Sequence, residues 1–348
     1  MALHVDPAGR SLGGTVPGPM WSCFYVSRTV NRLLGERSMR CSATMRFTWF
    51  LVATLVGCDT FSGQQASGSA DEPEASTASY RAGNPAGYPV QLVDAAGTRH
   101  TFEAAPRRII SLVPSATEAL LAMALANQVV GRTDYDRMPE LTGLPSVGGG
   151  LQPNLEILVS LDLDLVIRFA GDSDLATAER LTELGIPHFA VQPDGIEDVL
   201  TIIGDLGRIM GASDAADVML RDIRDTLDDV VRRVAELPEP RVVYLLGGDP
   251  PWVAGPGTYI DELITVAGGK NVFADLDPLY APVSMEALLD RDLDLILLSE
   301  GLTPPSPLAH VPSAVLPASV EIPGPGLGRA ARDIARLIHP GAFEAGPR

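Results

Sequence analysis

Four aromatic residues lie where predicted strands end, and they are the side chains of this sequence best suited to bind a small molecule. Only 5% of the chain is aromatic, yet loops after predicted strands contain Tyr135, Phe169, Trp252 and Tyr280. Aromatic side chains offer a large apolar contact area and lose little conformational entropy on binding. The pattern predicts a cleft lined by two aromatic residues from each half of the chain. The alternative is that each ring fills the end of its own half's core.

Residue patterns that carry catalysis or metal binding are missing from the sequence. It contains no G-x-S-x-G, no GxxxxGK[ST] and no strand-linked GxGxxG motif, which nucleophilic or phosphate-binding sites of the common classes require. The 5 histidines are scattered, whereas a transition-metal site needs two or three that converge. We therefore expect no catalytic residue, no metal site and no cofactor. An α/β enzyme, or a degenerate lipoprotein with an interaction role, is the alternative from another class.

Two glutamates occupy the second position of two short predicted helices whose surroundings are alike. Glu156 follows Asn154 in NLEILVSLDLDLVIRF, and Glu286 follows Ser284 in SMEALLDRDLDLILLS. The helix dipole favours a carboxylate at this position by about 0.3–1 kcal/mol, which explains each glutamate without a partner. Their equivalent placement indicates a second role, in which two exposed carboxylates dock on paired arginines of one partner.

Two α/β lobes joined by one long helix would position these residues. Strands alternate with helices on both sides of residues 213–237, which predicts mostly parallel sheets covered on both faces. Residues 213–237 contain neither Gly nor Pro, and a stripe at helical spacing comprises Met219, Ile223, Leu227, Val231 and Val234. This predicts one continuous helix, roughly 35 Å long. The N-terminal lobe is expected over residues 89–212 and the C-terminal lobe over residues 238–348.

The N-terminal part of the chain has the features of a secreted lipoprotein. Arg40 and Arg46 precede the apolar run FTWFLVATLVGC, which ends at Cys58. A basic segment followed by a short apolar run and small residues is typical of a signal peptide, and the run is too short to span a bilayer. The four residues LVGC resemble the bacterial lipobox. We therefore expect residues 1–57 to comprise an upstream extension and a signal peptide, and Cys58 to be lipidated in the periplasm or at the cell surface.

Residues 58–88 are rich in Ser, Gly, Ala and Glu and poor in large apolar residues, so they are expected to form a flexible tether. The net charge of −18 argues against binding nucleic acid through its phosphates. The 3 cysteines all lie at or before Cys58, so the folded part contains neither a disulfide nor a cysteine-based metal site.

Motifs between residues 107 and 299 resemble those of the solute-binding proteins of cobalamin and iron-chelate ABC importers, a family in which one long helix joins two lobes. The segments that carry the resemblance include RRIISLVPSATEALLAM, GRTDYDRMP, LPSVGG, PPWVAG, GGKNVFAD and DLDLILL. The likeness is greatest to vitamin B12-binding members. It implies a monomer that captures a corrinoid, cobalamin or cobinamide, between its lobes and delivers it to a permease dimer. Heme and ferric-siderophore binders share the scaffold and supply the alternative ligands.

The resemblance also implies roles for individual residues. The aromatic places of the cobalamin pocket correspond to Tyr135, Phe169, Trp252 and Tyr280. The two glutamates that pair with permease arginines correspond to Glu156 and Glu286. The sequence departs from the family at three places: Gly150 stands where a pocket tryptophan is expected, Gly326 replaces an arginine, and residues 299–323 lack a customary strand. From the last departure we expect a shortened C-terminal lobe.

Overall fold

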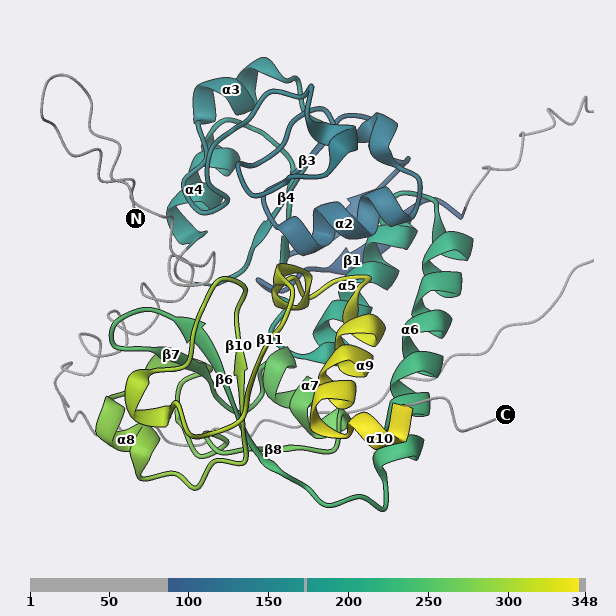
Figure 1. The fold of residues 1–348 in the computed structure, drawn as a ribbon. Coiled ribbons are helices and arrows are strands. Elements are labelled where there is room, and N and C mark those ends of the chain that lie inside the picture. Colours follow the sequence, from purple (N-terminus) through teal and green to yellow (C-terminus); the bar gives the residue numbers. More distant parts are fainter. Residues whose placement is uncertain (1–86, 172–173, 344–348) are drawn as a thin grey trace, which may run out of the picture.

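The N-terminal lobe is built on a small parallel sheet. The structure is a computed structural model that describes residues 87–171 and 174–343. The three-stranded sheet of the N-terminal lobe has the order β3 (Ile109–Ser111), β4 (Leu165–Phe169), β5 (His188–Val191), and all neighbouring strands are parallel. A hairpin of β1 (Val90–Val93) and β2 (Arg99–Phe102) precedes it. The helices of this lobe are α2 (Pro114–Ala122), α3 (Leu155–Ser160), α4 (Leu175–Glu183) and α5 (Ile196–Ile209), with short turns η1 (Ala126–Gln128) and η2 (Pro139–Leu141). Figure 1 shows this lobe stacked on the second.

The C-terminal lobe contains a larger, mixed sheet. Its strands are β6 (Arg241–Gly247), β7 (Trp252–Ala254), β8 (Lys270–Asn271), β9 (Tyr280–Pro282), β10 (Leu295–Leu298) and β11 (Ser313–Val315). The order is β11-β10-β6-β7-β9, with β8 beside β6. The helices are α7 (Tyr259–Val266), α8 (Met285–Leu289), α9 (Leu327–Ile338) and α10 (Pro340–Phe343), and the turns are η4 (Ser306–Leu308) and η5 (Ala318–Glu321).

Strand β11 corrects one expectation from the sequence. It lies within residues 299–323, where the sequence predicted no strand, and it pairs in parallel with β10 from Ile296 to Leu298. Only three residues long, with Pro312 before it and Pro317 after it, β11 is too short to show an alternating pattern. The sheet edge that a missing strand would have left open is therefore occupied.

The long helix α6 (Ser213–Val234) is unbroken, and its 22 residues run alongside both lobes (Figure 1). Its buried residues are Ala216, Ile223, Leu227, Val230 and Val234. The predicted stripe was wrong at one position, because Val231 is 46% exposed and Val230 is fully buried instead. The helix packs against both α5 and α9. The buried face is therefore set by two neighbours and not by one regular stripe.

The two lobes repeat the same local construction. In the N-terminal lobe the Asp164 carboxylate accepts the Arg108 backbone N–H at 2.9 Å, and in the C-terminal lobe Asp294 accepts that of Arg241 at 2.8 Å. The return bonds, from the aspartate N–H groups to the arginine carbonyls, measure 2.8 and 2.9 Å. Each aspartate thus begins one strand and fixes the start of its parallel neighbour, which explains the Asp-Leu pair that precedes both β4 and β10.

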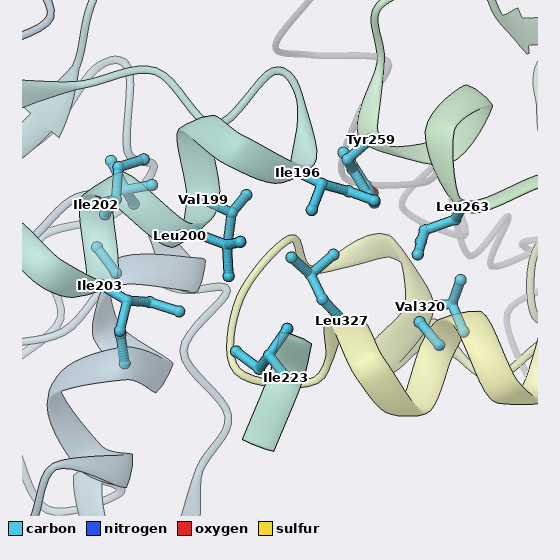
Figure 2. Packing of buried hydrophobic residues seen from close by; sticks show 14 of the residues in the cluster. Ile196, Val199, Leu200, Ile202, Ile203, Ile223, Tyr259, Leu263, Val320 and Leu327 are labelled. Atoms are coloured by element: carbon cyan, nitrogen blue, oxygen red, sulfur yellow. The ribbon is translucent and has the colours of Figure 1, made fainter. Parts of the chain in front are cut away.

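The lobes share a hydrophobic core, so α6 is not their sole connection. One continuous cluster of buried residues extends from Ile109 in the first sheet to Val242 in the second. Figure 2 shows Ile196 and Val199 of α5 gathered with residues of α7, α9 and η5, including Tyr259, Leu263 and Leu327. The predicted fold class, two α/β lobes joined by a long helix, is confirmed. The additional contacts through α7 and α9 mean that the lobes resist rotation about α6.

Two hydrogen bonds cross between the lobes at this core. The Glu262 carboxylate of α7 accepts the Ile196 N–H at 2.6 Å, and the Tyr259 N–H donates to the Asp194 carbonyl at 2.5 Å. Glu262 thereby satisfies one of the free N–H groups at the start of α5, where the helix dipole favours a negative charge. A side chain of one lobe thus stabilises the first turn of a helix in the other.

Candidate functional site

Gly150 and Phe169 lie together at the carboxyl edge of the N-terminal sheet. A Cβ atom on Gly150 would overlap the Leu112 carbonyl oxygen and would lie 3.6 Å from Cε2 of Phe169. Phe169 ends β4 and is half-buried. The backbone of residue 150 is thus pressed against the segment that follows β3, which leaves no room there for the tryptophan that the resemblance led us to expect. The departure at Gly150 reflects close packing of the loop.

Hydrogen bonds tie the loop of Tyr135 to the loop of Gly150. Asp136 is buried, and its carboxylate accepts both the backbone N–H and the hydroxyl of Thr133 at 2.7 Å. The Asp134 N–H donates to the Gly148 carbonyl at 3.0 Å. Tyr135, between these two anchored aspartates, is half-buried. The structure therefore places the loops of Tyr135 and Gly150 and the end of β4 at Phe169 along one edge of this lobe.

Trp252 and Tyr280 lie on adjacent strands, which corrects their expected placement on loops. Strand β7 pairs antiparallel with β9, so that Trp252 faces Pro282 and Ala254 faces Tyr280. Trp252 and Tyr280 are diagonal neighbours on the same face of the sheet. Trp252 is half-buried, whereas Tyr280 is only 2% exposed and belongs to the core. Tyr280 therefore matches the alternative in which the ring fills its own lobe's core.

The N-terminal cluster lies beside a crossing segment of the other lobe. Leu112, which touches Gly150, is followed by Ser115 at the start of α2. A Cβ atom on Gly324, in the C-terminal lobe, would lie 3.2 Å from the Ser115 carbonyl oxygen. The segment between η5 and α9 thus reaches the same edge of the N-terminal lobe as Gly150 and Phe169. That edge faces the C-terminal lobe.

A buried ion pair behind Phe169 was missed by the sequence analysis. The Arg168 guanidinium donates to the Asp174 carboxylate at 3.0 Å, to the Phe169 carbonyl at 2.8 Å and to His188 Nδ1 at 3.1 Å. Arg168 and Asp174 are both buried. Burial raises the pKa of Asp174 to about 6, although the nearby Arg168 charge acts in the opposite direction. The sequence did contain a signal for this pair, namely an arginine within the apolar strand LVIRF. A charge buried in such a strand requires a partner.

A groove between the lobes contains none of the predicted aromatic residues. Its volume is about 420 Å³, and it is lined by Glu118, Leu121, Ala122, Met138, Glu140, Ser319, Val320, Pro325, Gly326, Arg329, Ala330 and Asp333. Gly326, the position at which the family carries an arginine, precedes α9, and Arg329 one turn later lines the same groove. Partial burial, together with repulsion from Asp136, raises the pKa of Glu118 to about 7, while Arg329 opposes the rise.

The raised pKa of Glu118 predicts a pH-dependent stability. The folded protein binds this proton more tightly than the unfolded chain, whose glutamate has an ordinary pKa of 4.5. Ionisation therefore destabilises the fold, and the free energy of unfolding should fall as the pH rises from about 4.5 to about 7. Glu118→Gln should remove the part of this decline that Glu118 causes and raise the free energy of unfolding by about 1–2 kcal/mol at pH 8. Urea unfolding between pH 4 and 8 measures the effect, with Glu140→Gln as the control; parallel curves for Glu118→Gln and the parent chain would contradict it.

Glu156 and Glu286 are exposed on α3 and α8, which lie at the far ends of the two lobes (Figure 1). Asn154 caps α3 by accepting the N–H groups of Glu156 and Ile157 at 3.0 and 3.2 Å. Ser284 caps α8 by accepting the Ala287 N–H at 3.1 Å. The caps fix the direction in which each short helix leaves its loop. Both glutamates therefore occupy equivalent places, as the sequence predicted.

Two further features bear on the kind of site. Within the described residues, no three His, Cys, Asp or Glu side chains come together so that they could hold a metal ion. None of the helices over residues 87–171 and 174–343 combines the length and the apolar character needed to cross a membrane. The predicted signal peptide, Cys58 and nearly all of the predicted tether lie outside the described residues.

Two lobes linked by a long helix, with aromatic residues at the facing edge, define a protein of the two-lobed solute-binding class. The model of the periplasmic binding protein family matches residues 109–307. This match covers more than half of the chain, and the chain therefore belongs to the periplasmic binding protein family.

Relatives in this family include proteins named for cobalamin. A cobalamin-binding protein of Halobacterium salinarum is 30% identical over 241 residues, which is 67% of this chain and 64% of that protein. The chain thus matches somewhat less than two thirds of that relative's length. The crystal structure of a periplasmic vitamin B12 binding protein of Vibrio cholerae superposes with a TM-score of 0.61 at 24% identity, covering 69% of this chain and 99% of the other. A heme-binding protein of Roseiflexus sp. RS-1 gives 0.59 at 23% identity, with coverages of 68% and 99%. These two structures share the fold.

Proposed function

We propose that this protein is the solute-binding component of an ABC importer and that it captures a corrinoid, cobalamin or cobinamide, between its lobes without chemical turnover. The observation that carries the proposal is the placement of Phe169, Tyr135 and Trp252, which are half-buried and lie near lobe edges in a chain poor in aromatic residues. Part of each ring remains available for contact with a large, flat solute. The cobalamin-binding relative at 30% identity supports the same ligand class.

Corrinoid binding can be measured through Trp252. The chain contains 3 tryptophans, of which Trp21 and Trp49 precede Cys58. Micromolar cyanocobalamin or cobinamide should quench the fluorescence of Trp252, and Trp252→Phe should remove that part of the signal. In a chain that begins at Cys58, Trp252 is the sole tryptophan, so free N-acetyltryptophanamide corrects for the light that the corrinoid absorbs. No saturable difference between the two chains, together with no heat of binding by calorimetry, would exclude the corrinoid proposal.

Heme or a ferric siderophore is the second candidate, favoured by the structural similarity to the heme-binding protein. A heme iron would need an axial ligand, and Tyr135 is better placed than Tyr280, because Tyr280 is buried in its own lobe. A Soret shift on adding hemin that is lost in Tyr135→Phe would favour heme over a corrinoid.

We further propose that Cys58 carries a lipid anchor that holds the protein at the outer side of the cytoplasmic membrane or at the cell surface. The basic, apolar and LVGC segments support this arrangement. On detergent-phase partitioning of cell extracts, the parent chain should enter the detergent phase and Cys58→Ser should stay in the aqueous phase. Equal partitioning of both chains would contradict the anchor.

A further inference from the structure

The surfaces of α3 and α8 are equivalent residue by residue. From Asn154 to Ser160 and from Ser284 to Asp290, exposed, half-buried and fully buried positions follow in the same order. In each helix a single leucine, Leu158 or Leu288, is buried in its own lobe's core. The residue after that leucine points to solvent in both lobes. The equivalence therefore includes the outward faces as well as the buried ones.

An aliphatic side chain occupies that exposed position in both lobes. Val159 is 52% exposed and Leu289 is 47% exposed. Single exposed aliphatic residues are common on protein surfaces and mean little by themselves. Here they recur at the same place in two lobes. Valine also has a low helix propensity, so its presence on the outside of α3 does not serve the helix.

Each aliphatic residue lies three positions after a docking glutamate. The glutamate and the aliphatic residue are three positions apart in each helix, at Glu156 and Val159 and at Glu286 and Leu289. This spacing places both side chains on one face of the helix. Each lobe therefore presents a carboxylate beside a small apolar surface. The Asn154 and Ser284 caps hold the two faces in the same local orientation.

We propose that Val159 and Leu289 are contact residues for the importer's permease, and that each inserts into an apolar hollow beside the arginine that receives the neighbouring glutamate. This inference rests on the proposed function. Because α3 and α8 lie at opposite ends of the molecule (Figure 1) and present the same pair of groups, the partner must offer the same basic and apolar site twice. A two-fold symmetric membrane protein meets this requirement, since symmetry repeats one surface in two places.

The partner can be captured while the two glutamates and the two aliphatic residues of α3 and α8 stay unchanged. The exposed neighbours Ser160 and Asp290 are each replaced by the photoreactive residue p-benzoylphenylalanine in the full-length chain, and cells of the native host are irradiated. Both positions should crosslink to the same polytopic membrane protein, which mass spectrometry identifies. Its dissociation constant for the parent chain and for variants is then measured in nanodiscs, without any solute.

Three double variants separate the contributions of the aliphatic residues and of the glutamates to binding of the permease. Val159→Ser/Leu289→Ser should weaken binding about 5- to 10-fold per site, and about 25- to 100-fold together, because the sites are far apart. Glu156→Ala/Glu286→Ala tests the two carboxylates that the family resemblance pairs with permease arginines. Val218→Ser/Val231→Ser is the matched control, since these residues are 59% and 46% exposed on α6, away from α3 and α8. The control should bind like the parent chain.

The outcomes distinguish the inference from the proposed function. If the glutamate variant binds weakly and the Val159/Leu289 variant binds like the control, the inference is overturned and the permease role stands. If neither crosslinking position captures a polytopic membrane protein, the inference and the permease role both fail. A loss in both variants, with normal binding of the α6 control, establishes the paired carboxylate and apolar contacts.

Discussion

Replacing Arg168 by methionine should lower the free energy of unfolding by about 3–5 kcal/mol. Methionine retains most of the apolar volume, but the Asp174 carboxylate loses its cation in a site where both partners are buried. A buried charge without a partner is strongly destabilising. Urea unfolding at pH 7.5, compared with the parent chain, gives the value.

The size of this loss should depend on pH. Without Arg168 the pKa of Asp174 rises further above its ordinary value, because burial is then opposed only by the Thr177 hydrogen bond. At about pH 4 the carboxyl is protonated and needs no cation, so the variant should approach the parent chain as the pH falls. Above the new pKa the full loss should appear.

An exposed arginine on the adjacent helix provides the control. Arg180 pairs with Glu183 on the surface of α4, where both side chains are more than half exposed. Arg180→Met should change stability by about 0–1 kcal/mol. If Arg168→Met costs no more than Arg180→Met, the ion pair does not hold the segment after β4. A normal corrinoid affinity in a destabilised Arg168→Met would show that Phe169 keeps its position without the pair.

Glu156→Ala/Glu286→Ala should reduce uptake of labelled cyanocobalamin by cells to the level of cells that lack the protein, while its dissociation constant for cyanocobalamin stays unchanged. Both carboxylates are exposed on α3 and α8, at the far ends of the two lobes. Losing a charge-assisted contact at two points of one interface weakens the complex at both. Transport should therefore fail at docking and not at solute capture.

Each single variant should retain partial uptake, because the other lobe can still dock. A matched control is Glu236→Ala/Glu239→Ala, which removes two exposed carboxylates just beyond α6. This control should transport like the parent chain, which separates docking from the general effect of lowering the negative charge. Unchanged uptake in Glu156→Ala/Glu286→Ala would remove the docking role from both residues.

Much of the fold follows from local patterns in the sequence. Residues 213–234 form one helix because they contain neither Gly nor Pro and carry apolar residues at helical spacing. The two Asp-Leu segments predicted equivalent strand starts, and both aspartates indeed fix the backbone of a neighbouring strand. The aromatic and acidic candidates were found in the same way, because exposed helix tips and strand ends leave clear sequence marks.

The wrong predictions concern residues whose position is set by contacts between segments far apart in the sequence. Val231 fits a single helical stripe, but α6 packs against two helices, α5 and α9, and Val230 is buried instead. Tyr280 looked like a loop residue, whereas β7 draws it into a strand and into the core. Strand β11 exists because β10 offers a free edge, which no local propensity reveals.

By itself, the sequence determined the two α/β lobes, the long helix between them and the equivalent positions of Glu156 and Glu286, because each of these depends on residues close together in the chain. Only the tertiary structure decided that the lobes share one core, that Gly150 is pressed against Leu112, and that Arg168 and Asp174 are buried as a pair. Such contacts form where separate segments exclude water together, and their energies depend on burial that spacing along the chain does not encode.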